Sequence, residues 1–261
     1  MLPCGEYWRM SADGNRNEPT FDVEHDGVDS SSKLALGFSE FGLAGLTAAD
    51  YLVTHLELEQ VGRVLVEGLP VITPFAEGVP RHHTRLFSRD DLDLTVLVGE
   101  LFVPAGAAER FSENVLGWTE GTRIEEVIVL SGVPIAHGPE EHKPYYVATP
   151  DFTEARLSDT EITPTGGGFL DGVNGALMAR GLDSDLRTCL LTTPAHARAP
   201  DADAALRLLE AFLSIYDLDV DLGPMTEFAA RVSEHYEELD ARMQAAREEE
   251  ARSVPEDRMY M

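Results

Sequence analysis

Glycines gather in two stretches whose spacing could place backbone amides around a phosphate. The first, GFSEFGLAG, holds Gly37, Gly42 and Gly45 between a buried apolar run and a helical pattern. Backbone N–H groups at a helix N-terminus attract anions. The dinucleotide fingerprint fails, however, because its first two glycines must stand one residue apart. The triphosphate loop also fails, because Leu43 and Ala44 replace its lysine and hydroxyl. Tight packing of a helix on a strand explains these glycines better.

The second stretch, TPTGGGF, places Gly166, Gly167 and Gly168 ahead of another helical pattern. This loop could bind an anion, and a turn explains it equally well. We therefore predict that both stretches are structural glycine loops.

Histidine, arginine and cysteine supply few further candidates. RHHTR contains His82 and His83, but neighbouring residues of a strand point to opposite faces and cannot readily share one metal ion. A site in which Arg81 and Arg85 bind an anion stays an open alternative. Cys189 lies in an apolar run and is expected to fill the core. The sequence lacks H-E-x-x-H, G-x-S-x-G and C-x-x-C, so we predict no catalytic residue, no metal site and no cofactor.

The elements that must position these residues alternate between strands and helices. Apolar runs predict strands at 20–26, 33–38, 63–68, 71–76, 84–88, 94–100, 125–132, 144–149 and 186–193. Helical spacing predicts helices over 43–56 and 105–118, a helix ending at 181, and a capped helix over 201–216. The strands at 71–76 and 84–88 are expected to pair through EGVPRHH. Such alternation predicts a largely parallel sheet covered by helices.

The end of the chain differs in kind. A long charged helix is predicted from Pro224 to Arg252, with a narrow apolar stripe that includes Phe228 and Val232. This stripe suits packing on the core or against a neighbouring subunit. The sequence therefore divides into four predicted segments: a polar N-terminal tail (1–32), an α/β core (33–221), a C-terminal helical arm (222–252) and a flexible docking tail (253–261).

The last three residues, Met259, Tyr260 and Met261, follow a charged run. About one chain in a hundred would end in this way by chance. Apolar residues around a tyrosine, with a free carboxylate, suit insertion into a partner's pocket. We therefore predict that these three residues bind a partner.

Composition narrows the class of protein. The 261 residues are 43% hydrophobic, without an apolar run of 18 residues or an N-terminal signal pattern, so a globular cytoplasmic protein is expected. The formal net charge is −27, and Lys33 and Lys143 are the only lysines among 20 basic residues. Such a surface is typical of a salt-loving archaeon, because concentrated salt screens its self-repulsion. The same charge argues against nucleic acid or an anionic membrane as a partner.

Several segments together resemble the archaeal and bacterial proteasome assembly chaperone family. They are LALGFSEFGLAGLTAADYLVTHLELEQVGRV, GVPRHHTRLF, TPTGGGFLDGVNGALMARGLDSDLRTCLLTTP and DADAALRLLEAF, and they span about residues 34 to 220. The chain departs from the family at Ser39 and Glu40, where members more often carry small or proline residues.

The resemblance implies a three-layer α/β fold similar to nucleoside phosphorylases, assembled into homo-oligomers. It also implies a non-enzymatic binding protein that docks on the α-subunit ring of the proteasome core particle. Several proteasome-binding partners end in a hydrophobic residue, a tyrosine and any residue, and Met259, Tyr260 and Met261 match that pattern. The alternatives are a nucleoside hydrolase or phosphorylase-like enzyme, and an oligomeric binding protein unrelated to the proteasome.

Overall fold

The structure is a computed structural model that describes residues 18–26, 31–89, 91–135, 138, 141–196 and 200–232. Its strands are β1 (Thr20–His25), β2 (Lys33–Phe38), β3 (Glu59–Glu67), β4 (Phe75–Ala76), β5 (Val79–Pro80), β6 (Thr84–Arg89), β7 (Leu94–Gly99), β8 (Glu126–Val133), β9 (Tyr145–Ala148), β10 (Thr163–Pro164) and β11 (Arg187–Pro194). Its helices are η1 (Phe41–Leu43), α1 (Ala44–His55), α2 (Ala105–Thr119), α3 (Pro150–Phe152), η3 (Thr153–Leu157), α4 (Gly172–Leu182) and α5 (Ala202–Tyr216).

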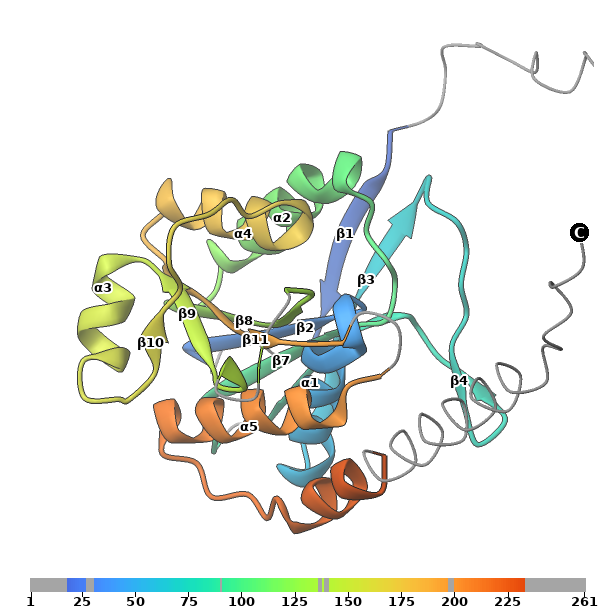
Figure 1. Ribbon diagram of the computed structural model, residues 1–261. Coiled ribbons are helices and arrows are strands. Elements are labelled where there is room, and N and C mark those ends of the chain that lie inside the picture. The colour runs from blue at the N-terminus through green and yellow to red at the C-terminus, as the bar shows by residue number, and fades with distance from the viewer. Residues whose placement is uncertain are drawn as a thin grey trace, which may run out of the picture.

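A nine-stranded sheet in the order β1-β3-β6-β7-β2-β8-β11-β9-β10 forms the middle layer. Its central strands β7, β2, β8 and β11 are parallel, whereas β1, β3 and β6 extend one side in antiparallel fashion. Helices α1 and α5 cover one face and α2 and α4 cover the other (Figure 1). The predicted three-layer α/β fold is confirmed, with a sheet that is mixed at its edges and parallel at its centre.

The central strands are apolar along their whole length because both of their faces are covered. In β2, Leu34 and Leu36 point into the core beneath α2 and α4, while Ala35 points into the core beneath α1 and α5. Cys189 lies fully buried in the second of these cores, as expected for a core-filling residue. Burial raises the pKa of its thiol far above the ordinary value.

One predicted strand pairing is wrong. The apolar run 71–76 forms a strand only at β4, which pairs with β5 in a separate two-stranded sheet. Strand β6 instead pairs with β3 and β7. Pro74 interrupts the run and Pro70 directly precedes it, and neither proline can donate a backbone hydrogen bond to a ladder.

The C-terminal helix begins at residue 223 and is helical to residue 232, where the described part of the chain ends. Met225 and Ala229 are buried against the core of α1 and α5. Phe228, the first member of the predicted stripe, is exposed instead. The remainder of the predicted helix to Arg252 lies outside the described residues.

Candidate functional site

The predicted docking residues Met259, Tyr260 and Met261 lie outside the described residues, so their role stays a prediction. The other predicted residues, the glycines of the two loops, lie within the described part. Gly37, Gly42 and Gly45 lie near the carboxyl edge of the parallel strands, the edge at which β2, β7, β8 and β11 end, whereas the three glycines of the second stretch lie in the loop between β10 and α4.

The first glycine stretch packs η1 and α1 against the sheet. A Cβ at Gly37 would lie 2.3 Å from the Gly45 carbonyl oxygen, and a Cβ at Gly45 would lie 1.9 Å from the Leu130 carbonyl oxygen. Gly42 has a φ of +64°, a conformation that side chains disfavour. These distances leave no room for a side chain where α1 crosses β2 and β8, as a packing role requires. Gly166, Gly167 and Gly168 differ, because a Cβ at any of them would meet nothing within 4 Å.

The chain changes direction between β2 and β8, which are neighbours in the sheet. After β2 it passes through α1 toward β3 on one side, and after β8 it continues to β9 and β11 on the other. In open α/β sheets, ligands bind outside the carboxyl ends of strands at such a switch point. A binding site is therefore expected at the residues just beyond β2 and at the end of β8.

A polar cluster of three side chains occupies this switch point. One carboxylate oxygen of Glu40 accepts hydrogen bonds from Ser131 Oγ and from Asn174 Nδ2, both at 2.7 Å. Asn174 Nδ2 also lies 3.0 Å from Ser131 Oγ. Burial raises the pKa of the Glu40 carboxyl, and these hydrogen bonds oppose that rise only in part. A side chain of the protein itself thus occupies the position where this class of sheet binds ligands.

Glu40 was identified from the sequence only as a departure from the family pattern, together with Ser39. Ser39 Oγ donates to the Glu100 carbonyl oxygen at 3.1 Å, so both residues tie the loop after β2 to neighbouring strands. Ser131 and Asn174 were not identified from the sequence, because they lie 91 and 134 residues from Glu40 in the chain and no local pattern connects them to it.

A second set of contacts holds the start of α5 against η1. Asp201 caps α5 by accepting from the Ala204 backbone N–H at 2.9 Å. Its other carboxylate oxygen contacts the backbone N–H of His196 at 2.8 Å and the ring Nδ1 of His196 at 2.7 Å. The Asp201 backbone N–H donates to the Gly42 carbonyl oxygen at 2.7 Å. Asp201 therefore links α5, the end of β11 and the first glycine stretch.

The arginines of RHHTR share one carboxylate. Arg81 Nη2 lies 2.8 Å from one oxygen of Glu100, and Arg85 Nη2 lies 3.0 Å from the other. His83 Nδ1 lies 2.9 Å from Thr84 Oγ1, and burial lowers the pKa of His83. Because Glu100 engages both guanidinium groups, the structure does not support an open anion site between them.

Exposed apolar side chains also gather at the carboxyl edge. Ten of the twelve large apolar side chains that are exposed in the described residues lie at this edge or on the arm that projects from it. We name the first group the carboxyl-edge rim: Phe41, Leu43, Phe102, Ile135, Phe169 and Leu170. The second group lies on the hairpin arm, residues 68–83, which contains β4 and β5. Exposed large apolar side chains that gather in one region are typical of a protein-binding site.

Two absences hold for the described part of the chain. No group of three or more His, Cys, Asp or Glu residues is placed there to hold a metal ion. None of the helices in these ranges combines the length and the apolar character that crossing a membrane requires.

A family model described as the PAC2 family matches residues 34–240. Among solved structures, Pyrococcus furiosus PbaA, described as an archaeal homolog of proteasome-assembly chaperone, is 19% identical with a TM-score of 0.77, over 93% of this chain and 100% of its own. Pyrococcus furiosus PbaB, described as an archaeal proteasome activator, is 19% identical with a TM-score of 0.72, over 85% and 99%. A Thermoplasma acidophilum protein of unknown function is 21% identical with a TM-score of 0.70, over 85% and 93%. No curated protein matches the sequence.

Proposed function

The chain belongs to the PAC2 family, since the family model spans residues 34–240, and on that premise we propose that it is a non-enzymatic proteasome assembly chaperone or adaptor. The descriptions of PbaA and PbaB, which share its fold, support a role at the proteasome. We propose that it acts in the cytoplasm as a homo-oligomer and docks on the α-subunit ring of the core particle.

The observation that carries a binding role is the character of the carboxyl edge. In an enzyme of this fold class, the switch point would be an open crevice for a small substrate. Here the Glu40 carboxylate fills that position and is held by Ser131 and Asn174. Around it lie exposed side chains such as Phe41 and Phe102, which offer apolar contact area to another protein.

The C-terminal residues supply the proposed plug. Tyr260 would bring a rigid ring with a hydroxyl group, and Met259 a flexible apolar side chain that adapts to an irregular pocket. The carboxylate of Met261 would pair with a cationic side chain of the ring. A single tail buries little area and binds weakly, but several tails on one oligomer raise the affinity about 10²–10⁴-fold.

The test is binding to isolated α rings and to complete core particles in molar KCl. Deletion of Met259 to Met261 is expected to weaken binding at least about tenfold, because the avidity depends on the tails. The matched control is Arg258→Ala, which alters the adjoining residue and leaves the plug intact. A chain extended by one glycine after Met261 tests the terminal carboxylate separately.

Equal binding by the truncated and intact chains would remove the plug from the proposal and leave the carboxyl-edge rim as the interface. Binding by neither chain would contradict the proteasome role. The enzyme alternative has its own readout: nucleosides with phosphate would raise the melting temperature, because a ligand that binds only the folded state stabilises it.

A further inference from the structure

The hairpin arm is held to the core at its base, where Arg81 pairs with Glu100 and Leu69 packs on the core, but its tip is exposed. Its strands β4 and β5 hydrogen-bond to each other in a separate sheet, and Figure 1 shows β4 well away from the layered core. Val71, Phe75 and Val79 are 91%, 73% and 65% exposed. A lone two-stranded hairpin is marginally stable in water, and exposed aromatic and branched side chains on it add to the cost. The arm therefore has the features of a segment that becomes buried on another surface.

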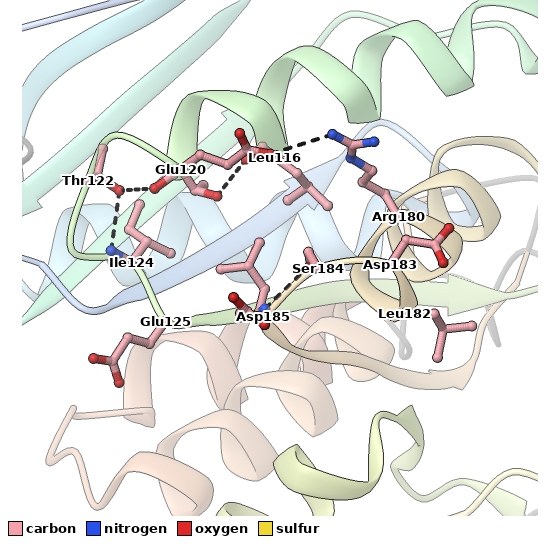
Figure 2. A pocket seen from close by; sticks show the side chains of 12 residues that line it. Leu116, Glu120, Thr122, Ile124, Glu125, Arg180, Leu182, Asp183, Ser184 and Asp185 are labelled. Atoms are coloured by element: carbon pink, nitrogen blue, oxygen red, sulfur yellow. Dashed lines mark hydrogen bonds and ion pairs between the residues drawn. The ribbon is translucent and has the colours of Figure 1, made fainter.

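A groove lies at the opposite edge of the sheet, the amino edge. A cavity of about 760 Å³ opens between the last turns of α2 and α4, beside the residues that precede β8 and β11 (Figure 2). Leu116, Ile124 and Leu186 line its interior. Leu182, at the end of α4, is 71% exposed on its border. Since Leu116 and Ile124 are already buried in the core, Leu182 is the main apolar side chain that the groove offers to a partner.

The arm and the groove lie at opposite edges of the same sheet. The arm leads into β6, whose first residue, Thr84, pairs with Gly99 at the carboxyl end of β7. The groove includes Glu125 and Leu186, which stand immediately before the parallel strands β8 and β11. An arm cannot fold back into the groove of its own chain across the sheet, but it can reach the groove of a neighbour. Repetition of one such head-to-tail contact closes a ring when the rotation permits.

Charge opposes this pairing less than it opposes contact with most other parts of the chain. The groove is lined by Glu120, Glu125, Asp183 and Asp185; Arg180 lies 3.5 Å from Glu120, and Arg187 lies 3.1 Å from Glu125. Within the described residues, Asp183 and Asp185 form no ion pair. Most of this chain would be repelled by such a groove, because its net charge is −27. The arm is an exception: between residues 68 and 83 it has one acid, Glu77, one arginine and two histidines.

We infer that the hairpin arm of one copy inserts into the amino-edge groove of a second copy, with Phe75 and Val79 as its apolar anchors and Leu182 as their contact in the groove. The inference rests on the self-association in the proposed function and specifies its interface. Screening by molar salt reduces the repulsion between the two acidic chains, so the contact forms best under those conditions.

The first experiment is a cross-link between two different chains. One chain carries Val79→Cys and the other carries Asp185→Cys, both with Cys4→Ser; Cys189 is buried and unreactive. A short bis-maleimide is expected to join the two chains when they are mixed in molar KCl. The control replaces Asp185→Cys with Glu109→Cys, an exposed position on α2 about two turns from the nearest groove residue, Leu116. Cross-linking of Val79→Cys chains to one another, or equal reaction with the Glu109→Cys chain, would overturn the inference.

The second experiment measures the mass of the assembly by light scattering over a concentration series. Phe75→Asp is expected to weaken self-association at least about tenfold, as loss of a central aromatic anchor does in protein interfaces. Phe102→Asp is the matched control, because it places the same charge on the exposed carboxyl-edge rim and is expected to leave the assembly intact. Far-UV circular dichroism of both variants checks that the core remains folded.

Each failure has a distinct signature. A monomeric wild-type chain, or a Phe75→Asp chain that assembles normally, would overturn the arm-in-groove contact. Binding of the unassembled wild-type chain to α rings through the arm would also overturn it. The proposed function is tested separately by the deletion of Met259 to Met261, which leaves both arm and groove unchanged.

Discussion

At Gly45, α1 approaches β8 more closely than any side chain would permit. A Cβ there would lie 1.9 Å from the Leu130 carbonyl oxygen, well inside van der Waals contact. Because the obstacle is backbone, no rotamer change can relieve it. The glycine is thus required by the distance between two elements.

We predict that Gly45→Ala lowers the free energy of unfolding by about 1–3 kcal/mol, the usual cost of forcing extra volume into a packed interior. Gly117→Ala is the matched control, since a Cβ at this position in α2 meets nothing within 4 Å. It should stabilise the protein by about 0.5–1 kcal/mol, because alanine favours helix over glycine. Guanidinium unfolding in molar KCl measures both. A harmless Gly45→Ala would contradict the packing argument.

Glu40 shows that the hydrogen-bond partners of a residue cannot be read from the sequence around it. Its neighbours in the sequence indicate a loop, whereas its hydrogen-bond partners come from β8 and α4. The cluster of Glu40, Ser131 and Asn174 exists because the order of the sheet places β8 beside β2. The sequence therefore identified Glu40 as an unusual residue, but it did not reveal that Glu40 lies at the switch point.

At the scale of elements, the first residues of α5 connect this helix to two other segments of the chain. The helix over 201–216 was predicted to be capped, and Asp201 at its start accepts a hydrogen bond from the Ala204 backbone N–H. Its bonds to His196 and Gly42 come from the chain passing beside β11 and η1. One carboxylate therefore holds three segments together.

We predict that Asp201→Ala costs about 1–2 kcal/mol of stability at neutral pH, as loss of a strong cap does. Asp201→Asn should cost less, because an asparagine side chain still caps the helix. Thermal and denaturant unfolding distinguish the variants. Equal losses for alanine and asparagine would indicate that the carboxylate charge, and not the cap, matters.

The pH dependence of this loss has a definite sign. Burial acts to raise the pKa of Asp201, but the hydrogen bonds from His196 and Ala204 outweigh it, so the pKa lies below its ordinary value of 3.8. A lowered carboxyl pKa stabilises the folded state above the ordinary pKa, and this contribution disappears as pH falls through the folded pKa. The stability difference between the wild type and Asp201→Ala should therefore shrink below about pH 4.

The run 71–76 shows the limit of pattern reasoning about elements. Its apolar and β-branched residues indicated a strand, but a strand also needs a neighbour with free backbone groups. Strand β6 is already paired on both sides, with β3 and β7. The run is consequently left outside the main sheet, as part of the hairpin arm.

At the scale of the whole molecule, charge dominates. A net charge of −27 on 261 residues produces repulsion that opposes the compact state. The ion pairs of the described residues relieve it locally, as where Glu126 contacts Arg156 and Arg187, both at 2.9 Å. They cannot balance 47 acids with 20 bases.

We predict that raising KCl from 0.1 M to 1 M increases the melting temperature by at least about 5 °C, corresponding to roughly 1–2 kcal/mol for a chain of this size. The Debye length falls from about 10 Å to about 3 Å over this range, which screens most surface repulsion. Sucrose at equal osmolality is the control. An equal effect of sucrose would attribute the stabilisation to exclusion from the surface and not to screening.

By itself, the sequence determined most of the elements and the α/β class, because periodicity, glycine placement and helix caps are local properties of the chain. The family came from the resemblance of whole segments to known members. It also marked Met259, Tyr260 and Met261 as an unusual ending. Only the tertiary structure decided which strands are neighbours, that Glu40 meets Ser131 and Asn174, and that the arm and the groove lie at opposite edges. These features depend on contacts between residues far apart in the chain, which the order of the sheet creates.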